Sequence, residues 1–204
     1  MTVKLFVEAI VKFLLGVVLV GCLVFIPMFI AGIVMMVKNP KLLASRLDAK
    51  EKQASQGIVI KLSGLMFIAG FVLAGLDYRF KWFEIPTFIP YIAAGLFLIG
   101  YVLWGVVLKQ NTYLSRTVKV VDGQTVVDTG LYGVVRHPMY SATILMFLAM
   151  PLILGSLIAL SVFVLYPVLI AVRIVNEEKL LSKELAGYEE YKKKVKYRVI
   201  PFIW

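Results

Sequence analysis

The chain has 204 residues, of which 61% are hydrophobic and 17% charged, and its formal net charge is +10. Soluble domains have about 45–50% apolar and about 25% charged residues, so this composition excludes an ordinary soluble domain. One cysteine, Cys22, and one histidine, His137, exclude a disulfide-rich scaffold and a metal site built from such ligands. The apolar residues gather in uncharged stretches of about 20 residues or more, the length of a helix that crosses a hydrocarbon core of about 30 Å. We therefore expect an all-α polytopic membrane protein.

Uncharged stretches and helix breakers predict about five transmembrane helices. No charged residue lies between Arg136 and Arg173, which is too long for one span, and Pro151 with Gly155 marks a break within it. This region therefore predicts a tight hairpin of two helices. The predicted spans are 13–37, 58–76, 85–108, 140–154 and 156–175.

The distribution of Lys and Arg predicts the orientation in the membrane. The segments 38–56, 109–136 and 173–204 hold five, four and eight of the 22 Lys and Arg residues. Positively charged short loops stay in the cytoplasm, so we expect the N-terminus outside and the C-terminus inside. The net positive charge then reflects topology and attraction to anionic membrane lipid, and no nucleic-acid partner is expected.

Residues 117–128 do not resemble an ordinary loop. They consist of two β-branched runs separated by Asp122-Gly123, a pair that favours a type I′ turn. A small hairpin or a paired extended segment is therefore predicted on the cytoplasmic side. It leads into residues 130–140, where Pro138 falls in the first turn of the fourth predicted span.

The region 176–204 predicts a cytoplasmic, amphipathic helical tail. Its apolar residues recur at steps of three and four and form one stripe on a helix otherwise covered by Glu and Lys. Gly187 is expected to break or kink this helix, and the apolar end 199–204 to pack back onto the protein. The stripe comprises Leu181, Leu185, Tyr188, Tyr191 and Val195.

Each polar residue near the last two spans has an ordinary explanation. Arg136 and His137 at a helix start are commonly topological charge and interface polarity. Arg173 lies one turn before Glu177, where a helix-end ion pair is expected. The acid pair Glu177-Glu178 is more typical of a solvated helix face than of a functional site.

The order and spacing of the whole set nevertheless resemble the isoprenylcysteine carboxyl methyltransferase family, which groups with membrane phospholipid N-methyltransferases. The resemblance covers about the last 90 residues, and the first three spans match only as hydrophobic helices. It implies one integral membrane domain, 1–204, with a cofactor-binding core at about 109–204 that binds S-adenosylmethionine at the cytoplasmic face. The two motifs are Gly130-x-Tyr-x-x-x-Arg-His-Pro-x-Tyr140 and Arg173-x-x-x-Glu-Glu-x-x-Leu-x-x-x-x-x-Gly187-Tyr-x-x-Tyr-x-x-x-Val195, with a closing Pro201.

The resemblance also implies roles for individual residues. Glu178, the second acid of the pair, would hold the cofactor, and Arg173 would lie near the reacting group of the substrate. Because Glu178 is taken as a surface carboxylate, its replacement by alanine is predicted to abolish cofactor binding in a folded protein. The other residues expected to contact the cofactor are Gln124, Thr125, Val126 and Val127 through their backbone, and Tyr132, His137, Pro138 and Tyr140.

The chemistry of S-adenosylmethionine suits these residue types. Its sulfonium and ammonium require an anion or aromatic face, available in the tyrosines and in Glu177 or Glu178. Its carboxylate requires an arginine or helix N-terminus, for which Arg136 is the candidate. Methyl transfer then depends on positioning, without a metal or a covalent nucleophile.

The methyl acceptor remains open between two groups. A carboxylate is ready at neutral pH and would need Arg173 to orient it, whereas an ammonium must first lose a proton to a base such as Glu177 or His137. In either case we expect a lipophilic small-molecule or prenylated substrate that enters from the membrane lipid.

Two alternatives compete with this interpretation. One is an NADPH-dependent membrane reductase of the sterol type, because such tails also contain a Tyr-x-x-Tyr-x-x-x-Val stretch before a Pro-aromatic end, as in 188–204. The other is a non-enzymatic membrane adaptor whose basic tail binds anionic lipid, which leaves both motifs without a function.

Overall fold

The computed structural model describes residues 3–38, 40, 43–44, 54–114, 117 and 120–204. These residues form seven α-helices and one short 3-10 helix, and no β-strand is present among them. The all-helical architecture predicted from composition is therefore confirmed for the described part of the chain.

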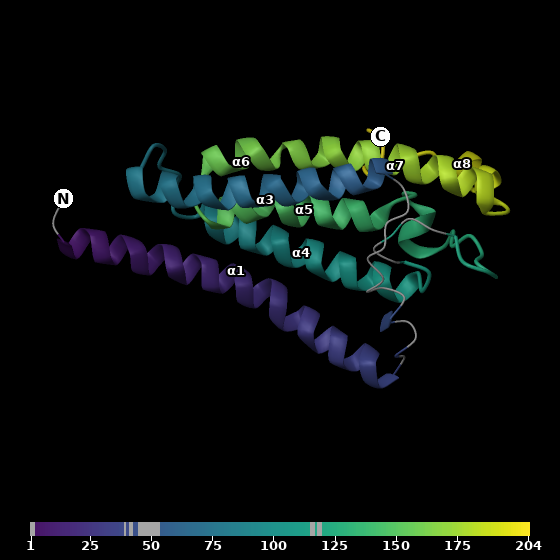
Figure 1. Cartoon of the computed structure of the whole chain (residues 1–204), viewed down its shortest axis with the longest axis horizontal. Helices are drawn as coiled ribbons and strands as arrows, with labels where there is room; N and C mark the ends of the chain where they lie inside the picture. Colours follow the sequence, from purple (N-terminus) through teal and green to yellow (C-terminus); the bar gives the residue numbers. More distant parts are fainter. Residues whose placement is uncertain (1–2, 39, 41–42, 45–53, 115–116, 118–119) are drawn as a thin grey trace.

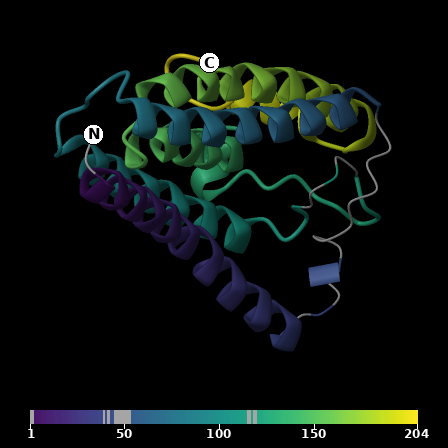
Figure 2. The same ribbon diagram turned by 60° about the vertical axis from the view of Figure 1, so that its left-hand side comes forward.

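Three helices precede the predicted hairpin. α1 (Val3–Lys38) continues through Pro27, α3 spans Ala54–Phe80, and α4 (Ile89–Gln110) begins with a proline in its first turn. α1 runs beside the bundle near its N-terminal end and diverges from it towards Lys38 (Figures 1 and 2).

The predicted hairpin is formed by α5 (Pro138–Ile153), α6 (Leu157–Phe163) and α7 (Leu165–Glu184). Gly155 makes the turn with a φ of 77°, a conformation that favours glycine. Ser156 caps α6 by accepting a hydrogen bond from the Ala159 amide. The break at Pro151 and Gly155 was correctly predicted. α7 continues past the predicted end of the span at residue 175 to Glu184, into the segment predicted to be an amphipathic helix, and it ends shortly before Gly187.

Three of the helical regions are long and apolar enough to cross a membrane: Gln56–Phe80, Ile89–Gln110 and Leu157–Glu184. They correspond to the second, third and fifth predicted spans. The first predicted span lies within α1, and the fourth corresponds to Pro138–Ile153, which is apolar but shorter. The outer faces of these helices carry exposed apolar side chains such as Leu65, Val102 and Val168, as expected for surfaces in contact with lipid.

Close helix packing fixes the bundle from which the site is built. A Cβ atom on Gly100 of α4 would lie 2.7 Å from Met146 Cγ and 3.0 Å from the Ala142 carbonyl oxygen of α5. Phe67 of α3 makes edge-on contacts with Phe147 of α5 and with α6, at a centroid separation of 4.7 Å for the first pair. The absence of a side chain at Gly100 lets α4 and α5 approach closely along their length.

The predicted type I′ turn at Asp122-Gly123 is wrong in detail. The chain does turn there, with the Gln124 amide donating to the Val121 carbonyl at 3.0 Å. Only Gly123 adopts a positive φ, 74°, whereas a type I′ turn requires positive φ at both central residues. The pattern matches a type II turn, and no strand pairing occurs among the described residues of 117–128; residues 118 and 119 lie outside them.

Candidate active site

The candidate site lies at one end of the bundle, where α4 ends, α5 begins and α7 ends (Figure 1). The chain between α4 and α5 and the chain after α7 meet there. The short helices η1 (Gly130–Gly133) and α8 (Tyr188–Lys194) belong to these connecting segments. Both motifs of the sequence therefore fall at the same end of the molecule.

The first motif begins with a tight turn held by the end of α4. Gly130 has a φ of 59° and lies against the Gln110 side chain, whose oxygen accepts a hydrogen bond from the Leu131 amide at 3.1 Å. The Asn111 side-chain amide donates to the Tyr132 hydroxyl at 3.1 Å. Burial raises the pKa of Tyr132 to about 12, so its hydroxyl remains protonated at neutral pH.

The chain after α8 returns to the start of α5, and we call residues 195–199 the return segment. The Arg136 and His137 amides donate to the carbonyl oxygens of residues 197 and 198, at 2.9 and 2.8 Å. Arg136 Nη1 also donates to the carbonyls of residues 195 and 196, at 2.7 and 2.8 Å. Ser141 Oγ donates to the carbonyl of residue 199 at 2.6 Å. The return segment is thus fixed against the first motif by backbone and side-chain contacts.

Glu178 connects these elements from α7. One carboxylate oxygen accepts from Arg136 Nε at 2.7 Å and lies 3.2 Å from His137 Nε2, and the other accepts from Arg198 Nε at 2.9 Å. Glu178 is only 5% exposed. Its interpretation as a surface carboxylate is therefore wrong, because both of its oxygens are occupied by buried or half-buried partners.

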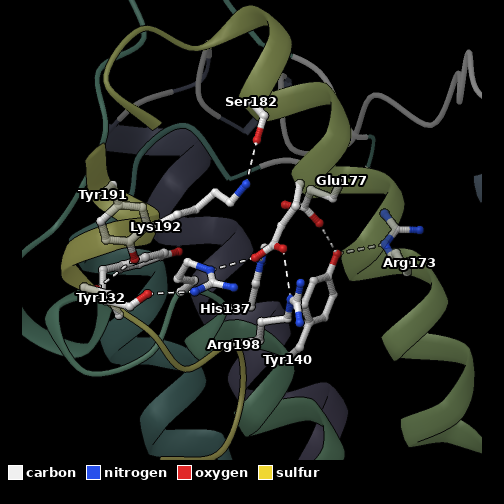
Figure 3. A network of polar contacts seen from close by, with 12 residues as sticks. Tyr132, His137, Tyr140, Arg173, Glu177, Ser182, Tyr191, Lys192 and Arg198 are labelled. Atoms are coloured by element: carbon white, nitrogen blue, oxygen red, sulfur yellow. Dashed lines mark hydrogen bonds and ion pairs between the residues drawn. The ribbon is translucent and has the colours of Figure 1, made fainter. Parts of the chain in front are cut away.

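Glu177 points in a different direction. Its carboxylate accepts a hydrogen bond from the Tyr140 hydroxyl at 2.7 Å, and Arg173 Nε donates to the same hydroxyl oxygen at 2.9 Å. Figure 3 shows Tyr140 between the two side chains. An acid, a phenol and a guanidinium from α5 and α7 are thereby placed side by side.

These groups line a cavity that encloses about 820 Å³, including the part open to solvent. Every predicted site residue except Pro138 and Glu178 lines it. The lining residues are Asn111, Tyr113, Leu114, Thr117, Gln124, Thr125, Val126, Val127, Tyr132, Arg136, His137, Met139, Tyr140, Arg173, Glu177, Leu181, Leu185, Tyr188 and Tyr191.

The apolar stripe of the tail forms one wall of this cavity. Leu185, Tyr188, Tyr191 and Val195 form a buried cluster, against which Val126 packs from the extended segment. Gly187 interrupts the tail with a φ of 81°, and α8 starts after it. Burial raises the pKa of both tyrosines well above the ordinary value, so they are neutral side chains.

Some lining residues were not anticipated as site residues. Asn111 and Tyr113 carry no sequence motif. Leu181, Tyr188 and Tyr191 belong to the second motif, and Leu185 to the apolar stripe, but no individual contact to the cofactor is predicted for them. The recurrence of tyrosine within that stripe was the available signal. Within the part of the chain described above, no group of three or more His, Cys, Asp or Glu side chains is arranged to hold a metal ion.

Comparison with known proteins identifies the segment that builds most of this site. Residues 91–183 match the model of the isoprenylcysteine carboxyl methyltransferase (ICMT) family. The matched segment is slightly less than half of the chain. The resemblance to this family noted from the two motifs is therefore confirmed for this segment.

Two individual proteins are similar over larger or different parts of the chain. The solved structure of the eukaryotic intramembrane Ras methyltransferase ICMT superposes with a TM-score of 0.57 at 18% identity, covering 83% of this chain and 60% of that one. The mouse (Mus musculus) Delta(14)-sterol reductase TM7SF2 is 31% identical over 121 residues, which are 52% of this chain and 29% of that protein. The chain thus spans less than two thirds of either relative. The structural likeness shows a shared fold and, with the apolar helices, supports an integral membrane protein.

Proposed function

We propose that the protein is an S-adenosylmethionine-dependent methyltransferase acting on a lipophilic substrate at the cytoplasmic face of a membrane. The observation that carries the proposal is the cavity itself, in which the Glu177 carboxylate, several tyrosines and basic side chains converge. Its walls come mainly from the segment that matches the model of the ICMT family. The cytoplasmic orientation, with the N-terminus outside, rests on the Lys and Arg distribution.

The residues of the cavity suit the charges of the cofactor. The Glu177 carboxylate and the faces of Tyr132 and Tyr140 would hold its cationic groups, and Arg136 and His137 would lie towards its carboxylate. The backbone of 124–127 forms an extended wall that offers peptide groups to the remaining polar atoms. The bound cofactor supplies an already activated methyl group, so the protein must orient the partners and exclude water.

For Glu178 and Pro138 we propose a positioning role in place of direct contact. Glu178 keeps Arg136 and His137 in the cavity wall through the contacts described above. Pro138 occupies the first turn of α5 and starts the helix directly after His137. Both residues then act on the cofactor through their neighbours.

Arg173 and Glu177 are the residues that we propose to act on the methyl acceptor. A carboxylate acceptor would be oriented by the Arg173 guanidinium, and an amine acceptor would need Glu177 to remove a proton. The Tyr140 hydroxyl contacts both Arg173 and Glu177, so it would help to position either side chain. A prenylated or otherwise lipophilic substrate fits either case, because the cavity lies where apolar helices end.

The similarity to the sterol reductase supports a second candidate function, NADPH-dependent reduction. Titration calorimetry of the purified protein with S-adenosylhomocysteine and, separately, with NADPH distinguishes the two. We expect saturable binding of S-adenosylhomocysteine, weakened in Glu177→Gln and unchanged in the control Glu190→Gln, whose side chain is exposed on α8. Binding of NADPH alone would favour the reductase. Mass spectrometry after incubation of membranes with labelled S-adenosylmethionine then identifies the acceptor.

A further inference from the structure

The loop formed by residues 199–204 is closed on itself. The amides of Val199 and Ile200 donate to the Trp204 carbonyl oxygen at 3.0 and 3.2 Å, and the Trp204 amide donates to the Ile200 carbonyl at 3.2 Å. Phe202 adopts a φ of 67°, which is uncommon for a residue other than glycine. The chain here is therefore a compact, hydrogen-bonded loop.

This 199–204 loop exposes nearly all of its apolar side chains. Phe202 is 87% exposed and Ile203 76%, and Ile200 and Trp204 are exposed to 45% and 36%. Val199, in contrast, is only 3% exposed and belongs to the core of the bundle. The loop is thus attached to the core at one end and presents a cluster of large apolar groups at the other.

The position of the loop places this cluster beside the membrane-spanning part. Val199 accepts a hydrogen bond from Ser141 in the first turn of α5, and it packs in the same core cluster as Ile170 and Ile174 of α7. In Figure 1 the chain turns back from α8 and ends beside the helical bundle. The loop therefore starts beside the first turn of α5 and the core of the bundle, whereas α8 lies further from the bundle.

The residues before the loop have the opposite character. Lys193, Lys194 and Lys196 are exposed on α8 and just after it. Tyr197 and Arg198, which follow these lysines, contact aromatic rings of the loop: the Tyr197 and Phe202 rings are 5.2 Å apart, and the Arg198 guanidinium lies 5.0 Å from the Trp204 ring. The sequence of basic, aromatic and apolar groups is that of an element lying in a membrane interface.

We propose that the 199–204 loop inserts into the membrane interface without crossing it. Phe202 and Ile203 enter the acyl-chain region, Tyr197 and Trp204 lie at the level of the headgroups, and the exposed Lys193 and Lys196 face anionic headgroups. The partner is the lipid surface on the side where the candidate site opens. This inference rests on exposure and position and is independent of the proposed methyltransferase function.

Site-directed spin labelling measures the depth of the loop directly. Cys22 is the sole cysteine of the chain, so a Cys22→Ala background carries one label, at Phe202→Cys or at the exposed control Lys193→Cys. The labelled proteins are reconstituted in vesicles containing anionic lipid, and collisions with oxygen and with a water-soluble nickel chelate are compared. We expect position 202 to lose nickel collisions and gain oxygen collisions, with the reverse at position 193.

Two outcomes would overturn the proposal. Equal access of nickel to positions 202 and 193 would place the loop in water. Protection of position 202 from both oxygen and nickel would mean that protein, such as a second copy of the chain, covers the loop. Because Phe202 is largely exposed, the cysteine variant should keep the thermal midpoint of the background, which confirms that the fold is intact.

Discussion

Replacing Glu178 with glutamine should destabilise the protein far more than the same change at Glu177. Glu178 and Arg136 form an ion pair at 2.7 Å with both side chains only 6% exposed. The second pair, with Arg198, is 31% exposed on the arginine side and is expected to contribute less. Removing the charge of Glu178 leaves the Arg136 guanidinium buried without its counter-ion.

The expected magnitude follows from this burial. Breaking a buried pair by removing one partner costs about 3–5 kcal/mol. Glutamine keeps the shape and one acceptor oxygen, so we expect the lower end, about 3 kcal/mol. For a chain of this length 1 kcal/mol corresponds to about 2–4 °C, which predicts a fall in the thermal midpoint of about 6–12 °C.

The assay compares the two variants in the same detergent. Thermal unfolding followed by intrinsic fluorescence gives the midpoint, and calorimetry with S-adenosylhomocysteine gives the affinity. For Glu177→Gln we expect a nearly unchanged midpoint and an affinity lowered by about 10-fold or more, because one charged contact to the ligand is lost. A Glu178→Gln protein with an unchanged midpoint but no cofactor binding would refute this reasoning and favour direct contact between Glu178 and the cofactor.

Three further changes test other parts of the site and fold. Arg173→Ala should lower turnover by about 100-fold while cofactor affinity changes little, because the substrate loses its orientation; a selective loss of cofactor affinity would reassign the residue. Tyr140→Phe, which removes the hydroxyl shared by Arg173 and the neighbouring acid, should lower turnover by about 10-fold, measured by methyl transfer from labelled cofactor. Gly100→Ala should lower the thermal midpoint, because its Cβ would lie 2.7 Å from Met146, whereas Gly105→Ala has open space and should not.

Local sequence was sufficient to predict most of the helical architecture. The uncharged stretch before Arg173, with Pro151 and Gly155, predicted a hairpin because a transmembrane segment of that length must break at its helix breakers. The predicted span ends near residue 175 because the apolar signal stops there, whereas α7 itself continues to Glu184 because the polar residues that follow are good helix formers. Hydrophobicity therefore predicts which residues cross the membrane, but it does not predict where the helix ends.

The acid pair shows why the candidate site was predicted less completely. Neighbouring residues on a helix point about 100° apart, so Glu177 and Glu178 cannot face the same space. Which one faces the cavity depends on where the return segment brings Arg198, and no local pattern contains that information. Asn111 could not be predicted for a related reason. A single amide at a helix end has no motif of its own, and only its hydrogen bond to the Tyr132 hydroxyl places it in the site.

Near its end, α7 therefore makes two different sets of contacts, and the candidate function needs both. On one side, Glu177 and Arg173 meet Tyr140 of α5 in the cavity. On the other, Glu178 joins the start of α5 to the return segment through Arg136 and Arg198. The return segment pairs with the backbone of the first motif, and so it holds Arg136 and His137 in place in the cavity wall. A tail placed in this way couples the shape of the site to its own position at the membrane surface.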